Sequence, residues 1–321
     1  MRFLVAPDSF KGTFDASEVA AAIAAGVEEA GAEADQCPVA DGGEGTMDVL
    51  LAALGGERRQ VEVSDPLRRP VVAEFALLDD ETAVVETARA SGLTLVAPEE
   101  RDPEGADTYG AGELIAAAVE AGARTILVAV GGSATTDGGR GAIEALRDRG
   151  ALSEVGRVEV LCDVRAPFED AARLFAPQKG ADPVAVERLT ARLDALAAQL
   201  PRDPRGIPMS GCAGGLSGGI WAYGAQLRPG ATFVLDAVDF DRRLAAADAI
   251  ISGEGRLDAQ SFAGKIVGEI ADRSADNGKP LHLIVGEQAL DGDDPTAVAS
   301  VATAQTPKEM RHQALALARQ A

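Results

Sequence analysis

The sequence predicts an α/β protein of two domains, one built on a parallel β-sheet and one with more antiparallel strands. The chain has 321 residues, enough for two ordinary domains with separate cores. Short apolar segments are repeatedly followed by a glycine-bearing loop and an alanine-rich helix, which is the repeating unit of a parallel sheet. Aromatic residues make up only 4%, a composition that suits helices packed on a sheet better than a β-sandwich.

The first repeating unit lies at the N-terminus. Residues 2–6 form the predicted strand, residues 7–14 the loop and residues 17–30 the helix. Asp15, followed three residues later by Glu18, is typical of a capping box at a helix start.

Two further units repeat this pattern. The predicted elements are a helix over 112–121, a strand over 125–130, a loop over 131–139 and a helix from about 141 to 149; then a strand over 248–251, a loop over 252–264, a helix over 266–275 and a strand over 281–285. Ligands of parallel sheets bind outside the carboxyl ends of the strands, so we expect the glycine loops of all three units to lie where a ligand binds.

The segment between the first two units has a different pattern. Residues 60–96 alternate apolar and polar side chains and contain turn signals at residues 64–66 and 78–80. This favours antiparallel strands and an inserted domain. Residues 187–200 have the pattern of an amphipathic helix, which the proline-rich residues 201–206 end.

The net charge of −21 limits the possible partners. It repels nucleic acid and anionic membranes, and no basic run offsets it locally, so we expect neither partner. It also repels small anions, so a site for one must supply its own cations, N–H donors or metal ions. The acidity could instead reflect the composition of the source organism, including adaptation to salt.

The cysteines and the N-terminus predict a soluble cytoplasmic protein. Cys37, Cys162 and Cys212 are far apart in the sequence and form no C-x-x-C pair, which suggests neither a disulfide framework nor a zinc site. Pro7 and Asp8 follow the first apolar residues too soon for a signal peptide, and no apolar run approaches about 18 residues.

Lysine is the scarce cation of this chain, with five lysines against twenty-five arginines. Four of the five stand beside a glycine: Lys279 in an ordinary turn, and Lys11, Lys179 and Lys265 in glycine-rich or turn-like segments. Such lysines are enriched for sites that need a compact ammonium group, as phosphate binding does, although they could also be solvated surface charges.

The first loop, residues 6–13, brings Asp8, Ser9 and Lys11 to the end of a predicted strand. The chain lacks the Walker A pattern, so a P-loop fold is not supported, but Lys11 could contact a phosphate as a point charge. The alternative is a capped turn with a surface lysine.

The second loop, residues 40–46, contains glycines and two acids. Gly42 and Gly43 let the backbone approach a ligand. Asp41 and Glu44 would repel phosphate directly, so they are interpreted as ligands of a phosphate-bound Mg²⁺ or as a base near a substrate hydroxyl. Glu44 could also simply favour the positive end of the next helix.

The third loop, residues 131–139, has the composition of an anion-binding nest. Its glycines, hydroxyls and acid are Gly131, Gly132, Ser133, Thr135, Thr136 and Asp137. Flexible linkers share this composition, but the loop stands between two strongly periodic elements.

The fourth loop follows the strand over 248–251 and contributes Gly253, Glu254, Arg256 and Asp258, with Lys265 just beyond. It resembles a dinucleotide fingerprint but has Asp258 where the third glycine should be, so nicotinamide binding loses support. Elsewhere, Lys179 lies on a turn and Asp163 at the tip of a strand.

Histidine is too rare for a histidine-centred triad. His282 lies inside a predicted strand and is interpreted as a packed core residue, which leaves only His312. The remaining carboxylates, lysines, hydroxyls and backbone groups are the inventory of metal-assisted phosphoryl transfer.

Six segments in order resemble the bacterial glycerate kinase family, whose members phosphorylate glycerate with ATP. They are Ala6-Pro7-Asp8-Ser9-Phe10-Lys11-Gly12, Ala40-Asp41-Gly42-Gly43-Glu44-Gly45-Thr46, residues 131–139, Pro177-Gln178-Lys179-Gly180-Ala181, Ala213-Gly214-Gly215-Leu216 and Gly253-Glu254-Gly255-Arg256-Leu257-Asp258. The family usually continues with Asn-Pro-Leu after Cys162-Asp163-Val164, whereas this chain has Arg165-Ala166-Pro167 and looks shortened there. This departure bears on Asp163 and on substrate preference.

The resemblance implies a fold and a reaction. The fold is a Rossmann-like or flavodoxin-like domain of residues 1–60 plus 236–321, with a mixed α/β domain of residues 61–235 inserted. The reaction is ATP-dependent phosphorylation of D-glycerate with Mg²⁺, giving 2-phosphoglycerate and ADP. A kinase for another small hydroxy acid and a non-catalytic nucleotide or sugar-acid sensor remain alternatives, and the oligomeric state is open.

Expected roles follow from the loops and the resemblance together. Expected catalytic residues are Asp41, Lys11, Asp163 and Asp137, and expected metal ligands are Asp41 and Glu44. Expected substrate or nucleotide contacts are Asp8, Ser9, Lys11, Gly42, Gly43, Gly131, Gly132, Ser133, Thr135, Thr136, Lys179, Gly253, Glu254, Arg256, Asp258 and Lys265.

Overall fold

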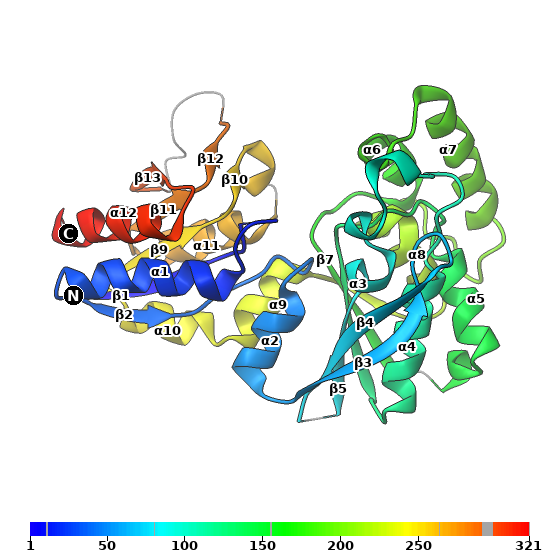
Figure 1. Ribbon diagram of the computed structural model, residues 1–321, viewed down its shortest axis with the longest axis horizontal. Coiled ribbons are helices and arrows are strands. Elements are labelled where there is room, and N and C mark those ends of the chain that lie inside the picture. Colours follow the sequence, from blue (N-terminus) through cyan, green and yellow to red (C-terminus); the bar gives the residue numbers. More distant parts are fainter. Residues whose placement is uncertain (11, 80, 155, 263, 291–297, 321) are drawn as a thin grey trace. The chain divides into compact units, whose positions relative to one another are not determined.

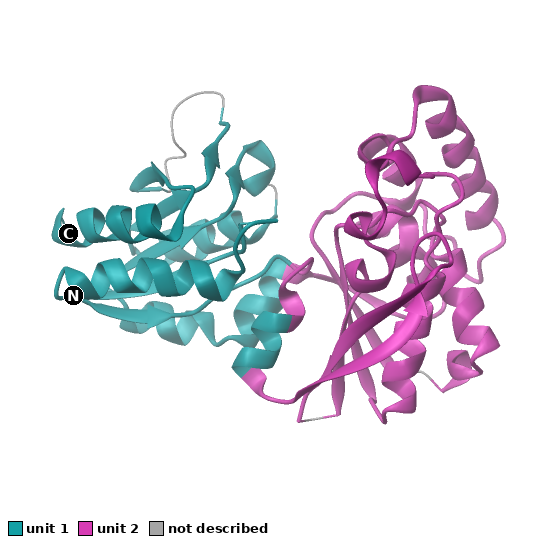
Figure 2. Cartoon of the chain, viewed as in Figure 1, with its two compact units in different colours: residues 1–41, 48–53, 231–321 teal, residues 42–47, 54–230 magenta. Residues whose placement is uncertain are grey.

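The chain forms two compact α/β units (Figure 2). The computed structural model describes residues 1–10, 12–79, 81–154, 156–262, 264–290 and 298–320. Unit 1 comprises residues 1–41, 48–53 and 231–321, and unit 2 comprises residues 42–47 and 54–230. The chain thus passes between units at residues 41/42, 47/48, 53/54 and 230/231, whereas the sequence analysis placed two changes, at 60/61 and 235/236.

Unit 1 contains a parallel five-stranded sheet in the order β13-β11-β9-β1-β2 (Figure 1). Its strands are β1 (Arg2–Pro7), β2 (Glu33–Gln36), β9 (Ala249–Gly253), β11 (Leu281–Val285) and β13 (Ser300–Thr303). Counted within the unit, this is the flavodoxin-like order 2-1-3-4-5, in which the chain builds outward in both directions from the β1/β9 pair. That pair is the topological switch point, where doubly wound folds bind ligands.

The three central strands of unit 1, β1, β9 and β11, are mostly apolar because helices cover both faces of the sheet, whereas the edge strand β2 is polar. Phe3 and Val5 pack in a cluster with α1 (Ala16–Glu29) and α12 (Pro307–Gln320). Leu4 and Ala6 point to the opposite face and pack in a cluster with α10 (Phe240–Ala246) and α11 (Ile266–Asp276). The alternation of a strand therefore places every second side chain in a different core.

The predicted capping box at the start of α1 is confirmed. The Asp15 carboxylate accepts a hydrogen bond from the Glu18 backbone N–H at 2.8 Å, and the Glu18 carboxylate accepts one from the Asp15 N–H at 3.1 Å. Two otherwise unpaired donors at the helix start are satisfied in this way.

Unit 2 contains a mixed six-stranded sheet in the order β3-β4-β5-β6-β7-β8. Its strands are β3 (Glu57–Ser64), β4 (Pro70–Leu77), β5 (Thr82–Glu86), β6 (Thr125–Val130), β7 (Arg157–Cys162) and β8 (Gln226–Pro229). The β3/β4 and β4/β5 pairs are antiparallel and the other three pairs are parallel. The predicted class, a parallel-sheet domain with an inserted mixed α/β part, is confirmed.

The amphipathic helix predicted over 187–200 begins and ends earlier than expected. In the structure α7 spans Pro183–Ala197, because the Asp182 carboxylate caps the Ala185 N–H at 2.7 Å and proline is well suited to the first helical position. Its buried Leu189 and Leu193 pack against Phe168.

The other helices and short strands complete the two units. They are α2 (Thr46–Leu54), α3 (Ala88–Ser91), α4 (Tyr109–Glu120), α5 (Arg140–Asp148), α6 (Ala171–Phe175), α8 (Leu216–Ala222), α9 (Gly230–Ala237), β10 (Arg256–Leu257) and β12 (Glu287–Gln288). Within the described ranges, no helix is both long and apolar enough to span a bilayer.

Candidate active site

A cavity of about 560 Å³ lies in unit 1 at the carboxyl ends of its central strands. We call it the switch-point pocket. It is lined by seven of the residues expected in a site, namely Asp8, Ser9, Asp41, Glu254, Arg256, Asp258 and Lys265. The first and fourth glycine loops, which are more than two hundred residues apart in the sequence, therefore share one cavity.

Strand pairing explains this convergence. Pro7 pairs with Gly253, and the Asp8 N–H donates to the Gly253 carbonyl at 2.8 Å, so Asp8 and Glu254 follow adjacent strand ends. The Val39 N–H donates to the Pro7 carbonyl at 3.0 Å, which carries the chain to Asp41 beside the same strand.

The switch-point pocket combines buried carboxylates with cations. Asp8 is 4% exposed and Asp41 is 2% exposed, whereas Arg256 is exposed and lies 3.7 Å from Asp258 and 3.6 Å from Glu287. Lys265 stands at the N-cap of α11, an eleven-residue helix whose positive end favours anions. A buried carboxylate is costly unless a cation, a hydrogen bond or a metal ion compensates it.

The carboxylates of this pocket suit a magnesium ion that is held largely by water and substrate phosphates, not one that is enclosed by protein side chains. Among the described residues, no three His, Cys, Asp or Glu side chains are grouped as a metal site. Mg²⁺ is commonly held by one or two carboxylates together with water and substrate phosphates, and Asp8 is a buried carboxylate of this pocket suited to that role. Glu44, expected as the partner of Asp41, lines a different pocket, which belongs to unit 2.

In unit 2 the central feature is the loop of residues 131–139, which we call the glycine loop. The Lys179 ammonium is 2% exposed and donates to the Ser133 hydroxyl at 3.0 Å and to the Thr135 carbonyl. Burial lowers the pKa of Lys179 from 10.5 to about 7, an effect that the charges of Asp137 and Asp163 oppose. Lys179 is therefore not a solvated surface charge.

Asp137 ties the glycine loop to two helices. Its carboxylate accepts four hydrogen bonds: from the Thr108 N–H at 3.0 Å, the Thr108 hydroxyl at 2.8 Å, the Gly139 N–H at 3.1 Å and the Gly141 N–H at 2.9 Å. Thr108 precedes α4 and Gly141 lies in the first turn of α5. The observed contacts make Asp137 a residue that holds the loop in place.

Residues 213–216, another of the six segments that resemble the glycerate kinase family, pack directly against the glycine loop. The Gly138 N–H donates to the Gly214 carbonyl at 3.0 Å. A Cβ added at Gly214 would lie 2.0 Å from the Thr135 carbonyl oxygen, and Gly214 has φ of +66°. Only glycine fits this approach without displacing backbone.

The second loop and Asp163 lie at the other end of the glycine loop, within unit 2. A Cβ added at Gly131 would lie 3.0 Å from the Gly43 Cα and 3.6 Å from an Asp163 carboxylate oxygen. A Cβ at Gly132 would lie 3.8 Å from a Glu44 carboxylate oxygen. Gly43, Glu44, Gly131 and Asp163 are thus brought together, as expected for residues of one site.

The remaining residues singled out in the sequence differ in their surroundings. Gly42 packs against the β7 end, where a Cβ would lie 3.3 Å from the Leu161 carbonyl. The Thr135 and Thr136 hydroxyls are fully buried and have no hydrogen-bond partner among the described residues. Lys11 lies outside the described residues. His282 is only half-buried, and its Nδ1 lies 2.8 Å from the Ser300 hydroxyl.

The structure adds supporting residues that the sequence analysis missed. Glu86 is 1% exposed and accepts the Met47 N–H at 2.8 Å, which fixes the end of the second loop. Arg192 donates to the Thr136 carbonyl at 3.1 Å. Glu86 could have been found by the signal that identified Asp163, an acid at the tip of an apolar strand, whereas Arg192 lies on the exposed side of a helix and has no such signal.

The fold and these loops define the class of the protein as an α/β phosphotransferase. Comparison with known proteins gives the family: the model described as "Glycerate kinase family" matches residues 3–151 and 148–321. The chain belongs to the glycerate kinase family, and it is an enzyme of that kinase type.

Individual relatives match over most of their length. The chain is 36% identical over 324 residues to a protein of Escherichia coli named "Glycerate 2-kinase", covering 89% of this chain and 85% of the relative. It is 39% identical over 325 residues to a "Glycerate kinase" of Haemophilus influenzae, covering 89% and 86%. A crystal structure assigned as glycerate kinase 2 from Salmonella typhimurium superposes with a TM-score of 0.83 at 34% identity, covering 100% and 98% of the two chains.

Proposed function

We propose that this enzyme transfers the γ-phosphoryl group of ATP to D-glycerate and releases 2-phosphoglycerate and ADP. The observation that carries the proposal is the switch-point pocket, where buried Asp8 and Asp41 share a cavity with Ser9 and Lys265 in a member of the glycerate kinase family. The relative named "Glycerate 2-kinase" supports the 2-phosphate product.

The proposed step is an in-line displacement. The 2-hydroxyl oxygen of glycerate bonds to the γ-phosphorus, the bond from that phosphorus to the bridging oxygen of ADP breaks, and the hydroxyl proton passes to a carboxylate. Asp41 is our candidate for that base, because it is a buried carboxylate lining the pocket at the second loop. Ser9, Lys11 and Lys265 would contact the phosphates, with Lys265 placed at the positive end of α11.

Magnesium would be held by Asp8 together with the ATP phosphates, which leaves the role of base to Asp41, and when bound it would neutralise charge on the transferred group. The chain's own groups supply the rest. The exposed Arg256 guanidinium offers a planar fork for the glycerate carboxylate.

We assign the residues of unit 2 to two roles: some contact the substrate, and others hold the glycine loop in place. Glu44 and Asp163 lie close to Gly131 and Gly132 and would orient substrate oxygens at the start of the glycine loop. Lys179 and Asp137 hold that loop in a single conformation through their buried contacts. They are positioning residues, and their substitution should reduce activity through the loop.

The direct experiment measures ADP release with D-glycerate, ATP and Mg²⁺. Lys11→Ala, Asp41→Asn and Asp163→Asn should each lower kcat/KM by about 10²-fold or more, the usual cost of removing one preorganised charged group. Asp272→Asn is the matched control, because it removes one carboxylate from the exposed side of α11 and should retain full activity. If all three site variants matched the control, the assignment would fail.

A kinase for a different small hydroxy acid is the second candidate. It is favoured by Arg165-Ala166-Pro167, where the family pattern departs directly after Asp163. A panel of hydroxy acids with the same ADP readout decides between the two, since D-glycerate should give the highest kcat/KM under our proposal.

A cytoplasmic location is also part of the proposal. It is supported by three free and buried cysteines, which suit a reducing compartment.

A further inference from the structure

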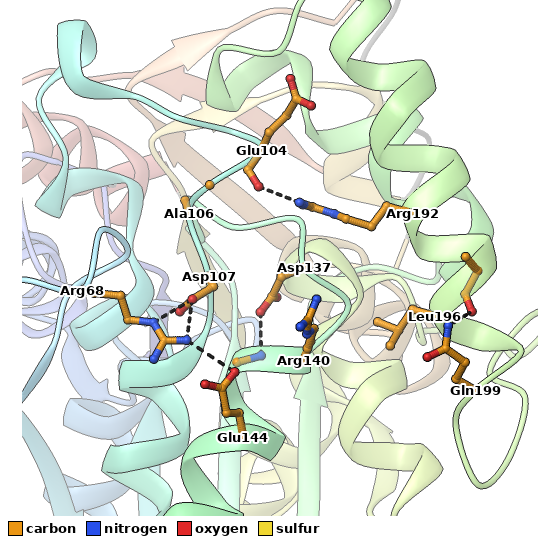
Figure 3. Close-up of a pocket in the computed structure, with 13 residues that line it drawn as sticks. Arg68, Glu104, Ala106, Asp107, Asp137, Arg140, Glu144, Arg192, Leu196 and Gln199 are labelled. Carbon is orange, nitrogen blue, oxygen red and sulfur yellow. Dashed lines mark hydrogen bonds and ion pairs between the residues drawn. The ribbon is translucent and has the colours of Figure 1, made fainter.

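Unit 2 contains a second cavity, of about 540 Å³, that the proposed reaction does not use. We call it the arginine pocket, because Arg68, Arg140 and Arg192 line it from three different elements (Figure 3). Asp137 is the only expected catalytic residue among its lining residues, and its carboxylate is occupied by the start of α5. The volume is within the usual range of about 300–1,000 Å³ for small-molecule sites.

The carboxylates that line this pocket are already engaged by protein groups. The Asp107 carboxylate accepts a hydrogen bond from the Arg68 Nε–H at 2.7 Å, and the Glu144 carboxylate lies 3.6 Å from the same guanidinium. The Glu104 carboxylate accepts a hydrogen bond from the Arg188 Nε–H at 2.8 Å. Asp137 accepts four hydrogen bonds from backbone and Thr108. The negative charge of the pocket is therefore largely compensated from within the protein.

The cations of the pocket retain unused donors. A guanidinium has five N–H donors. Arg192 uses donors on the Glu104 and Thr136 carbonyls, and the guanidinium of Arg140 makes no hydrogen bond or ion pair with any described residue. Figure 3 shows Arg140 beside Asp137 on the wall of the pocket.

The position of Arg140 is electrostatically unfavourable for the free protein. It is the first residue of α5, where the positive end of the helix dipole disfavours a cation, and the first turn of α5 contains no acid. A bound anion would offset this local electrostatic cost.

We propose that the arginine pocket is a binding site for a phosphate-class oxyanion, held by Arg140 at the start of α5 and by Arg192 of α7. A planar guanidinium matches two oxygens of a phosphate group, and the nearby helix end adds to the attraction. The occupant is either the phosphate chain of a nucleotide other than the one in the switch-point pocket or a free phosphate compound, and the two sources share this chemistry.

The experiment is arginine footprinting of the full chain with phenylglyoxal, read by peptide mass spectrometry. Inorganic phosphate is compared with chloride at equal ionic strength. Phosphate should slow the labelling of Arg140 and leave Arg147 unchanged, since Arg147 lies in the last turn of the same helix and outside the pocket. Equal labelling of Arg140 in both salts would overturn the proposal.

Substitution gives an independent measurement that does not depend on labelling. Arg140→Gln should weaken the phosphate binding of this site at least about tenfold, the loss expected for a charged hydrogen bond, whereas Arg147→Gln should not change it. Both side chains are exposed, so both variants should fold. Retention of full phosphate affinity by Arg140→Gln would contradict the proposal.

ATP as a second probe identifies the source of the anion. Protection of Arg140 by ATP at concentrations far below those at which inorganic phosphate protects assigns the pocket to a nucleotide; protection by phosphate but not by ATP assigns it to a separate anion. The kinase proposal fails on a different result, the absence of ADP release with D-glycerate, so the two proposals can fail independently.

Discussion

Lys179 shows how one buried cation can organise a loop. It is enclosed between the glycine loop and its own turn, and its ammonium bonds to Ser133 and to the Thr135 carbonyl. Because burial lowers its pKa to about 7, the folded protein loses this proton near neutral pH, whereas the unfolded chain keeps it up to about pH 10. Lys179 therefore makes the free energy of unfolding depend on pH between about pH 7 and pH 10, a range in which few other side chains titrate.

We predict that stability rises with pH above pH 7 and that Lys179→Met removes part of this rise. Between pH 7 and pH 10 the unfolded state binds more protons, so the free energy of unfolding increases, by on the order of 1 kcal/mol per pH unit from this group. Urea denaturation at pH 7 and pH 9 measures the difference. Lys308→Met, an exposed control, should keep the wild-type slope; an unchanged slope in Lys179→Met would contradict the assignment.

Asp137 provides the second prediction at this scale. Asp137→Ala should destabilise the protein by about 2–4 kcal/mol, because it leaves four buried or partly buried donors without their acceptor. Asp163→Asn should cost far less stability while reducing turnover. Thermal or urea unfolding of the two variants separates them, and equal stability losses would contradict the distinction between Asp137 as a positioning carboxylate and Asp163 as the carboxylate that we propose contacts the substrate.

At the scale of elements, the glycine loop is fixed by segments far apart in the sequence. Residues 213–216 and the turn containing Lys179 both contact it, and the Ala134 N–H donates to the Ser91 carbonyl at 2.9 Å. Three of the family-like segments are therefore one structural assembly in unit 2.

This assembly predicts that Gly214→Ala is much more damaging than Gly150→Ala. Both glycines have positive φ, +66° and +70°, so alanine costs a similar amount of backbone strain at either position, about 1–2 kcal/mol. At Gly214 the new Cβ also meets the Thr135 carbonyl oxygen at 2.0 Å, whereas at Gly150 nothing lies within 4 Å.

Differential scanning calorimetry and the ADP assay test this pair. Gly150→Ala should lower Tm modestly and keep its activity. Gly214→Ala should lower Tm further and lose most of its activity, because the glycine loop must shift. A Gly214→Ala variant that behaved like Gly150→Ala would show that the contact does not constrain the loop.

The sequence predicted the elements that depend on local patterns. The bounds of β6 agree with the apolar run at residues 125–130, and the capping box of α1 was readable from Asp15 and Glu18. It did not predict that Asp41 and Glu44 line different pockets, because three residues of loop can carry a chain from one compact unit into the other. Nor did it reveal that Cys162 and Cys212, fifty residues apart, have thiols in contact, an arrangement that raises the pKa of Cys162.

At the scale of the whole molecule, the net charge of −21 opposes the binding of anionic substrates. Glycerate and ATP are both anions, and the bulk of the protein repels them. Cations line both described pockets: Lys265 and Arg256 in unit 1, and Arg140 and Arg192 in unit 2. Acids outnumber them in the switch-point pocket, so under our proposal a magnesium ion would add the positive charge that an anionic substrate needs there.

The most direct test of the account is ³¹P NMR of the purified enzyme with ATP, D-glycerate and Mg²⁺. Our account predicts that ADP and the phosphomonoester of 2-phosphoglycerate appear in equal amounts, and that neither forms when glycerate is omitted. Release of inorganic phosphate without a glycerate ester, or no consumption of ATP at all, would contradict it.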